Sequence, residues 1–477
     1  MHMSKFRVLS EEEILKIHHS SLQVLSETGV KIYSKSALCL LEEGGAEVDM
    51  GKRIAKLPNK MVKEAITTLP EKIEMYNSRT KELAFTLGDG KPHVECGHGI
   101  WFKDIETGDR RRVNIKDVSE FALVSDALEH IDIVGLAGIP DDVPQKSAII
   151  HACAAVFNNT HKPIFFAPDQ SKITNVVYDI ARIVIDEDDL SKHPILICQV
   201  SPSSPLTWVG FAVEALMDTA KNGVPCNILP EPCSGVTSPL TLAGHLVLNN
   251  SEWLSGVVIS QLIRKGAPVL YTGCWTTFDM RSSRALVASP ETSILRVAGA
   301  QMSRFYNVPC HSISFDTDAA TLDAQYGSEK TLSILSALNS GVDFLVNAGE
   351  YDSLVLVGHE SLIVDHEIIG MLLRFVRGME ITSDTLGVKM INEVGPGNNF
   401  ITEPHTLKYL RAGEHWEVNA FNRTLHEKWK DKGSPNISEN AKNIALGILE
   451  NYHPQKLPET KIKEIEKVIE KFESIVG

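Results

Sequence analysis

The chain has 477 residues, and its 47 Lys and Arg against 61 Asp and Glu give a formal net charge of −14. Hydrophobic residues make up 43% and charged residues 23%, which excludes a disordered or collagen-like chain. The acidic balance argues against binding to nucleic acid or to anionic membranes, because both need clustered Lys and Arg. An acidic field attracts cationic ligands more readily than anionic ones. We expect a cytoplasmic protein, since residues 1–30 lack an apolar signal run and no window of about 18 apolar residues could span a bilayer.

Residues 1–115 predict an N-terminal region of helices followed by a small sheet. Ser10 and Glu13 have the spacing of a capping box, and apolar residues then recur at helical spacing up to Gly29. Two further helices are predicted over 37–43 and 58–67. From 82 to 114, short β-prone runs are separated by glycine-containing turns, which is typical of an antiparallel sheet.

Residues 116–412 alternate short apolar runs with longer helical patterns, which indicates parallel strands joined by crossover helices. Eight β/α units over about 300 residues favour a closed eight-stranded TIM-type barrel. A doubly wound open sheet is the alternative, but no glycine-rich phosphate motif follows the first strand. The predicted strands are 131–136, 163–167, 195–200, 225–229, 268–272, 309–314, 342–347 and a weaker one at 386–394.

Residues 413–477 predict a helical extension. Ile462, Ile465, Ile469, Phe472 and Val476 form one apolar stripe among Lys and Glu. Such a helix packs either on the barrel or on a second subunit, and we expect a homo-oligomer.

Catalytic groups of a barrel lie just after its strands. The positions after the predicted strands are rich in aromatic residues and carboxylates and poor in Lys and Arg. This combination does not suit a phosphate, but it suits a cation, because aromatic faces attract quaternary ammonium groups by about 0.5–2 kcal/mol per ring. The candidate aromatic residues are Tyr271, Trp275, Phe278, Phe315 and Tyr351.

Two short clusters could hold a metal ion, but we expect no metal bound by this chain. Residues 93–98 contain two His, a Glu and a Cys, yet they fall in the predicted N-terminal sheet, away from the barrel mouth. Cys310 and His311 lack a third ligand at a suitable spacing.

Several stretches resemble the trimethylamine–corrinoid methyltransferase superfamily, and in particular its glycine betaine-type members that lack pyrrolysine. The run D-A-Q-Y-G-S-E-K-T at 323–331 is similar to the family's D-x-Q-x-G-x-E-K-T motif. The other matching stretches are 234–244, 250–256, 276–280, 288–291, 362–369 and 394–400.

The resemblance implies an eight-stranded β/α barrel that moves a methyl group from an amine to the Co(I) of a corrinoid. The cobalamin is expected on a cognate corrinoid protein or supplied free, as in the one-carbon and methylamine metabolism of anaerobes. Alignment through Asp323, Gln325, Gly327 and Glu329 puts Asp316 where pyrrolysine stands in the pyrrolysine-bearing enzymes. This departure argues against trimethylamine as the substrate.

A quaternary amine fits the chemistry, because its methyl is already electrophilic and its leaving group is a neutral tertiary amine. The favoured substrate is glycine betaine, giving dimethylglycine; proline betaine, carnitine or another quaternary amine is the alternative. Asp316, Glu231 or Glu350 would offset the positive charge, with Asp316 favoured as the catalytic residue. Donors for a substrate carboxylate are His311, His359, Asn347 and Gln199.

Two other functions stay open at this stage. One is a non-catalytic betaine binder, which dimethylglycine formation would exclude. The other is a zinc methyltransferase of the corrinoid-to-thiol step, which metal analysis would reveal.

Overall fold

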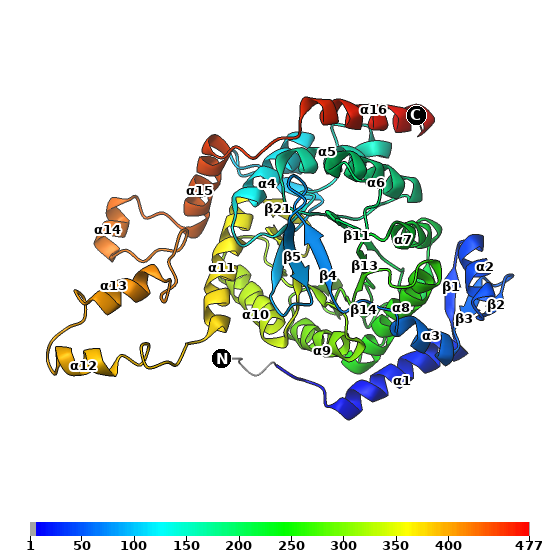
Figure 1. Cartoon of the computed structure of the whole chain (residues 1–477), viewed down its shortest axis with the longest axis horizontal. Coiled ribbons are helices and arrows are strands. Elements are labelled where there is room, and N and C mark those ends of the chain that lie inside the picture. The colour runs from blue at the N-terminus through cyan, green and yellow to red at the C-terminus, as the bar shows by residue number, and fades with distance from the viewer. Residues whose placement is uncertain (1–5, 477) are drawn as a thin grey trace.

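The computed structural model describes residues 6–476, and its centre is a ring of eight parallel strands surrounded by helices (Figure 1). The sheet order is β15-β13-β11-β10-β9-β6-β19-β18, and a parallel bridge between Tyr271 and Cys310 joins the two outer strands. The ring is therefore the TIM-type barrel that the sequence predicts. Its strands are β6 (His93–Cys96), β9 (Ile133–Gly135), β10 (Ile164–Phe166), β11 (Leu196–Val200), β13 (Cys226–Ile228), β15 (Val269–Leu270), β18 (His311–Ile313) and β19 (Phe344–Ala348).

Each barrel strand is followed by a helix of the outer layer, as right-handed β/α crossovers require. The strands are short and buried on both faces, which explains their apolar sequences. In chain order the helices are α4 (Ile115–Ala127), α5 (Ala148–Asn159), α6 (Ser171–Ile185), α7 (Gly210–Asn222), α8 (Leu242–Ile263), α9 (Pro290–Tyr306), α10 (Ala324–Ser340) and α11 (His359–Arg377).

Seven of the eight predicted strands are confirmed, but the predicted strand over 386–394 is wrong. That segment contains the helix α12 (Val388–Val394), whose apolar side chains Val388 and Ile391 are exposed. The missing barrel strand is β6, which lies in the segment assigned to the N-terminal sheet. Its four residues include His93 and Glu95, so the sequence contains no apolar run at this strand, although all four residues are buried.

The N-terminal helices agree with the sequence. Helix α1 (Glu11–Glu27) begins with both bonds of the capping box between Ser10 and Glu13. Helices α2 (Lys35–Glu43) and α3 (Asn59–Ile66) follow, with α1 and α3 packed against α8. The strands β1 (Val30–Ile32), β2 (Glu47–Asp49) and β3 (Ile54–Lys56) form a small sheet with β12 (Thr207–Trp208).

An antiparallel hairpin of β4 (Ile73–Tyr76) and β5 (Leu83–Leu87) closes the end of the barrel where the strands begin (Figure 1). Its Phe85 stacks on His93 at the start of β6, with ring centroids 4.3 Å apart. Met75 and Leu87 join Phe165, Ile197 and other inward side chains in one apolar cluster inside the barrel. We call this the closed end of the barrel.

Two small sheets frame the opposite end, which we call the mouth. One consists of β20 (Glu350–Tyr351), β21 (Leu356–Gly358), β7 (Trp101–Lys103) and β8 (Arg110–Arg112). The other consists of β14 (Cys233–Ser234), β16 (Thr276–Asp279) and β17 (Arg284–Leu286). All of these strands come from segments that follow barrel strands, so they rise from the carboxyl ends of the barrel.

After α11 the chain leaves the barrel as an arm, residues 379–435, which carries α12, α13 (Pro404–Arg411) and α14 (His426–Asp431) (Figure 1). It then returns as α15 (Ile437–Asn451), which packs against α11 and α4. The last helix, α16 (Glu459–Val476), buries Ile465, Ile469 and Phe472 against the α5–α6 side of the barrel. The apolar stripe of the C-terminal helix therefore packs on the barrel, which is one of the two predicted locations.

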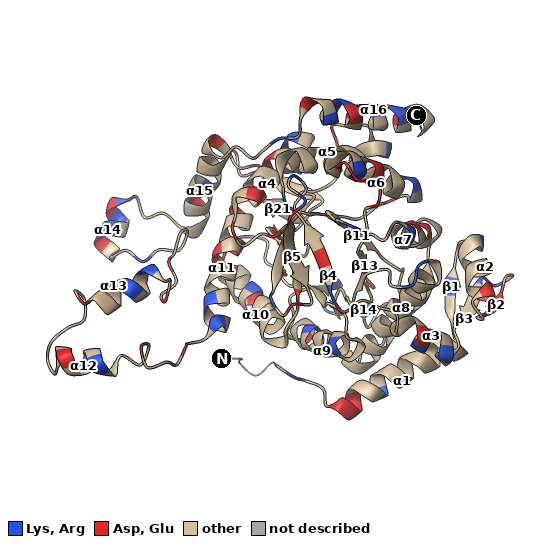
Figure 2. Ribbon diagram, in the orientation of Figure 1, with Lys and Arg blue, Asp and Glu red and all other residues tan. Residues whose placement is uncertain are grey.

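Lys and Arg are interspersed with Asp and Glu along the outer helices (Figure 2). Among residues 6–476, no helix combines the length and the apolarity that crossing a membrane requires.

Candidate active site

Four carboxyl groups gather at the mouth, each from the end of a different barrel strand. Glu95 is the penultimate residue of β6, Glu231 follows β13, Asp316 follows β18 and Glu350 follows β19. Cys274, after β15, lies within electrostatic range of the last three, and Glu350 is within range of Glu95 and Asp316. Neighbouring carboxylates repel one another, and this repulsion disfavours their ionisation. The mouth is therefore a place where added positive charge is stabilised.

Glu95 points from β6 into the barrel and is 1% exposed. Its Oε2 accepts a hydrogen bond of 3.0 Å from the backbone N–H of Asn347. Gly135 on the neighbouring strand makes room for the carboxyl, because a Cβ there would collide with Oε1. Burial raises the pKa of Glu95 well above its usual range, and the single Asn347 donor offsets only part of this.

Glu350 is also 1% exposed, and neither of its carboxyl oxygens has a hydrogen-bond partner among the residues that the structure describes. Burial, followed by the charges of Asp316 and Glu95, raises the pKa of its carboxyl well above the usual range. Gly97 lets the end of β19 approach the chain after β6 closely, because a Cβ at residue 97 would lie 2.6 Å from the Cα of Asn347. A buried carboxyl without a donor is costly, and such groups often mark a functional site.

A buried ion pair holds the chain around Glu350 in place. Lys330 of α10 lies 2.5 Å from Asp365 of α11, and both side chains are fully buried. Lys330 Nζ also donates to the backbone carbonyl of Glu350 at 2.6 Å, and Gly349 N donates to Asp365 at 2.6 Å. Asn347 and Gly349 have positive φ angles of 79° and 92°. The strained turn after β19 is thus fixed by charge-assisted bonds from two outer helices.

Asp316 differs from Glu350 because it has a cationic partner. Arg296 of α9 forms an ion pair with Asp316 Oδ2 and also donates to the carbonyls of Ile313 and Val287. Burial raises the pKa of Asp316 to about 6, and the Arg296 guanidinium opposes the shift. Glu231, in contrast, is exposed to solvent at the mouth and accepts a hydrogen bond of 2.8 Å from the Ser201 hydroxyl. The charge of Asp316 is already largely offset within the protein.

A polar layer lies deeper in the barrel than the carboxyl groups. Asn227 donates to Gln199 at 3.0 Å and lies 3.5 Å from His311 Nε2. The His311 ring packs against Phe165 and Phe344, with centroids 6.3 and 5.3 Å away. Desolvation lowers the pKa of His311 to about 3, so this imidazole is neutral at physiological pH. Gln199 and His311 thus share one network, whereas Asn347 contacts Glu95 through its backbone.

A cavity of about 750 Å³ opens from the mouth beside Glu95. Most of its wall is apolar, and it continues from the end of β10 to the rim sheet of β7 and β8. His98, whose side chain is exposed to solvent, also lines the cavity. The lining residues are Glu95, His98, Gly99, Ile100, Arg112, Leu136, Gly138, Ile139, Asp141, Gln145, Ile149, Phe165, Phe166, Ala167 and Leu354.

The five predicted cage aromatics are not brought together at the mouth. Tyr271 packs on Trp253 and Tyr306 of the helix layer, with centroids 4.8 and 6.0 Å away. Four of the five belong to the core between the barrel and its helices, namely Tyr271, Trp275, Phe315 and Tyr351. Phe278 is partly buried on β16.

The reason for this difference is strand alternation. Successive side chains point to opposite faces of a strand, so Leu270 lies inside the barrel and Tyr271 outside. A residue's position just after a strand predicts that it lies at the mouth end of the barrel, but does not predict whether its side chain points into or out of the barrel. His359 is likewise outside the mouth, on the first turn of α11 between Phe102 and Phe121.

The residues that sequence reasoning missed are Glu95, Arg296 and Lys330. Glu95 falls in the 93–98 cluster, where no apolar run indicates that β6 is a barrel strand. Lys330 lies in the 323–331 motif, and Arg296 is an isolated charge in the apolar run 294–298, so both had a signal in the sequence.

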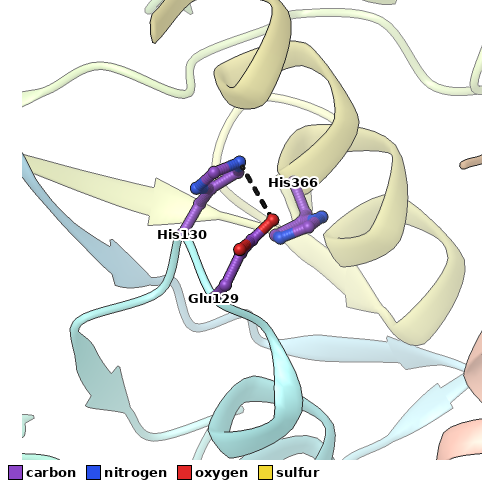
Figure 3. A group of neighbouring side chains, drawn as sticks. All are labelled: Glu129, His130 and His366. Carbon is purple, nitrogen blue, oxygen red and sulfur yellow. Dashed lines mark ion pairs between the residues drawn. The ribbon is translucent and has the colours of Figure 1, made fainter. Parts of the chain in front are cut away.

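The metal-ligand candidates Cys310 and His311 lie on opposite sides of the barrel wall. Adjacent residues of a strand face opposite sides, so Cys310 lies in the outer core while His311 lies inside the barrel. Figure 3 shows a further group, Glu129, His130 and His366, between the loop before β9 and helix α11. Its two imidazoles are stacked at 4.7 Å with planes 24° apart, so their in-plane lone pairs do not converge on one point.

The chain matches, over residues 1–476, the family described as trimethylamine methyltransferase (MTTB). The trimethylamine methyltransferase MttB of Desulfitobacterium hafniense (strain DSM 10664 / DCB-2) is 33% identical over 469 residues, covering 98% of this chain and 94% of the relative. The glycine betaine methyltransferase of Desulfitobacterium hafniense (strain Y51) is 29% identical over 465 residues, covering 97% and 96%.

Among solved structures, the monomethylamine methyltransferase MtmB of Methanosarcina barkeri has the same fold. It aligns with a TM-score of 0.56 at 11% identity, covering 95% of this chain and 90% of MtmB. The hydroxylamine complex of MtmB aligns with a TM-score of 0.58 at 12% identity over the same shares. The fold and the match over nearly the whole length agree, and the chain belongs to the trimethylamine methyltransferase (MTTB) family.

Proposed function

We propose that the protein transfers a methyl group from a quaternary amine to the Co(I) of a separate corrinoid protein. Glycine betaine is the favoured substrate and dimethylglycine the product. The observation that carries the proposal is the set of carboxyl groups at the mouth, of which Glu95 and Glu350 have no ion-pair partner among the described residues. A permanent cation is the ligand that such a site stabilises most.

The reaction needs no proton transfer. The C–N bond breaks with its electron pair passing to nitrogen, so a quaternary ammonium leaves as a neutral tertiary amine. The corrinoid supplies the electron pair for the new bond to carbon, and Co(I) becomes Co(III). This chain holds the methyl group in line with the acceptor and excludes water. The depressed pKa of His311 agrees with a site that does not use an imidazolium acid.

Each carboxyl group has a distinct role in this proposal. Glu350 and Glu95 stabilise the ammonium group from the barrel side, and Glu231 adds negative charge from the accessible side of the mouth. Asp316, at the position of pyrrolysine in the pyrrolysine-bearing relatives, keeps the Arg296 guanidinium neutralised. A free guanidinium at that position would repel the substrate, so the ion pair has a positioning role.

Two features support glycine betaine over trimethylamine. One relative at 29% identity is named glycine betaine methyltransferase. Asp316 also replaces the residue that the resemblance associates with activation of tertiary amines. Proline betaine, carnitine and other quaternary amines share the required chemistry and are the alternative substrates.

A substrate panel tests the proposal. The purified chain is incubated anaerobically with cob(I)alamin and, in turn, glycine betaine, proline betaine, carnitine, choline and trimethylamine. We expect methylcobalamin and dimethylglycine with glycine betaine, and no methylation with trimethylamine. Transfer from trimethylamine alone would contradict the proposal. Stoichiometric zinc together with methyl transfer from methylcobalamin to a thiol would support the zinc enzyme instead, and betaine binding without transfer would support a binder.

A further inference from the structure

Three consecutive arginines form strand β8 at the rim of the mouth, and two of them have carboxylate partners. Arg110 lies 3.0 Å from Asp352. Arg111 pairs with Asp104 at 2.9 Å and with Asp117 at 2.5 Å. Arg112 has no carboxylate within ion-pair distance among residues 6–476, and its guanidinium is positioned over the Trp101 ring, 4.3 Å from the centroid.

Arg112 lines the same cavity as Glu95. Alternation along β8 places Arg112 on the face opposite Arg111, which packs against Phe102 and Asp117. Stacking on Trp101 restricts the side chain while its N–H donors stay available. The cavity therefore has a buried carboxyl at its inner end and an unpaired guanidinium at its rim.

Most of the wall between these two ends is apolar. It includes Ile100, Leu136, Ile139 and Phe165, which can contact methyl and methylene groups but cannot satisfy a charge. Asp141 also lines the rim, without an ion pair to Arg112. A molecule that bridges the cavity would be complemented best if it carried a cation at one end and a carboxylate at the other.

We propose that Arg112 binds the carboxylate of a zwitterionic quaternary amine whose ammonium group lies toward Glu95 and Glu350. This inference rests on the proposed function and narrows its substrate class. It makes Arg112 a residue that discriminates betaines from simple cations such as choline or tetramethylammonium. Planar guanidinium groups suit this task because they bind carboxylates through two parallel hydrogen bonds.

Calorimetric binding to the full chain tests the proposal without requiring turnover. Glycine betaine and tetramethylammonium are titrated into the wild type, Arg112→Gln, Arg112→Lys and the matched control Arg110→Gln. We expect Arg112→Gln to weaken betaine binding roughly ten- to a hundredfold and to leave tetramethylammonium binding within about twofold. Arg112→Lys should retain part of the affinity, and Arg110→Gln should behave as the wild type.

The outcomes separate this inference from the proposed function. Equal losses for both ligands, or no loss for betaine, would overturn the role of Arg112. Failure of the wild type to bind either ligand would also overturn it. Betaine binding that depends on Arg112, combined with no methyl transfer to cob(I)alamin, would sustain this inference and refute the proposed reaction. Unchanged thermal unfolding of Arg112→Gln, expected for an exposed side chain, confirms that the variant is folded.

Discussion

The two ends of the barrel differ in how their buried groups are satisfied. At the closed end, the β4–β5 hairpin packs Met75, Leu87 and Phe85 against inward apolar side chains. At the mouth, Glu350 is equally buried but has no hydrogen-bond partner among the described residues. Apolar burial stabilises the fold, whereas an unpartnered buried carboxyl destabilises it. The closed end is thus stabilised by apolar packing, and under the proposed function a cationic substrate would supply the charge that the buried carboxyl at the mouth lacks.

The buried carboxyl groups near the mouth are of two kinds, those with a cationic partner and those without one. Asp316 and Asp365 are each paired with a buried cation, while Glu95 and Glu350 are not. The paired groups hold the loops after β18 and β19, and in the proposed function the unpaired groups are the ones that contact the substrate. Substitutions at the two kinds of position should therefore have opposite effects on stability and activity.

Glu350→Gln should produce the largest change in activity. Removing a buried counter-charge from a cation site costs about 2–5 kcal/mol, so kcat/KM for glycine betaine should fall roughly a hundredfold or more. Thermal stability at pH 7.5 should be unchanged or higher, because the glutamine brings no buried charge. Steady-state assays and thermal unfolding measure the two effects, with Glu214→Gln on the outer helix α7 as the matched control. A wild-type rate would show that Glu350 does not face the substrate.

Lys330→Met should produce the largest loss of stability. It leaves Asp365 as an unpaired buried charge, for which a cost of about 3–5 kcal/mol is expected. The double variant Lys330→Met with Asp365→Leu should recover much of this loss, because both charges are then absent. Urea unfolding measures each variant. Equal stability of the single and double variants would contradict the idea that the ion pair fixes the turn at Glu350.

Met75→Ala tests the closed end. Met75 is fully buried, and truncation of such a side chain costs about 2–5 kcal/mol through lost transfer energy and a residual cavity. Because the hairpin lies at the opposite end from the mouth, kcat/KM should stay within about twofold at a temperature where the variant is folded. Leu83→Ala, at a half-exposed position of the same hairpin, should change stability by less than about 0.5 kcal/mol. If Met75→Ala lost activity without losing stability, the idea that the closed end serves stability alone would be contradicted.

The last prediction concerns the pH dependence of stability and of cation binding. Burial raises the pKa of Asp316 to about 6 and those of Glu95 and Glu350 well above the usual range. A raised carboxyl pKa contributes stability that is fully present below the unfolded value and is lost as pH rises through the folded value. The ligand-free protein should therefore lose stability from about pH 4 upward through pH 6 and beyond.

A bound cation favours the ionised form of these carboxyl groups. The affinity of the protein for a cation should therefore rise with pH, whereas the stability of the ligand-free protein falls. Tetramethylammonium should bind more tightly at pH 8 than at pH 5, by up to about tenfold per pH unit for each coupled carboxyl. Calorimetry at both pH values measures this, and Glu350→Gln should show a shallower dependence. Affinity independent of pH would mean that these carboxyls stay ionised without the ligand.

The sequence predicts the barrel and its helices because short apolar runs and amphipathic segments alternate with a clear period. It does not predict β6, whose inward residues are the polar groups that a binding site needs. The sequence also does not predict whether Tyr271 and Phe315 point into or out of the barrel, because a one-residue change of strand register exchanges the two faces. Asp316, Glu231 and Glu350 were predictable as residues of the mouth because carboxyl ends of barrel strands converge. Their partners were not, because Arg296 and Lys330 come from helices whose approach only the folded chain determines.

The most direct measurement is a single-turnover reaction with glycine betaine that carries deuterated N-methyl groups. The wild-type chain and excess cob(I)alamin are mixed anaerobically, and the products are followed by absorbance and mass spectrometry. We predict one deuterated methyl on cobalt for each dimethylglycine formed, and a much slower reaction for Glu350→Gln. Unlabelled methylcobalamin, or no transfer from a betaine that binds to the mouth, would contradict methyl transfer from a quaternary amine as the function of this site.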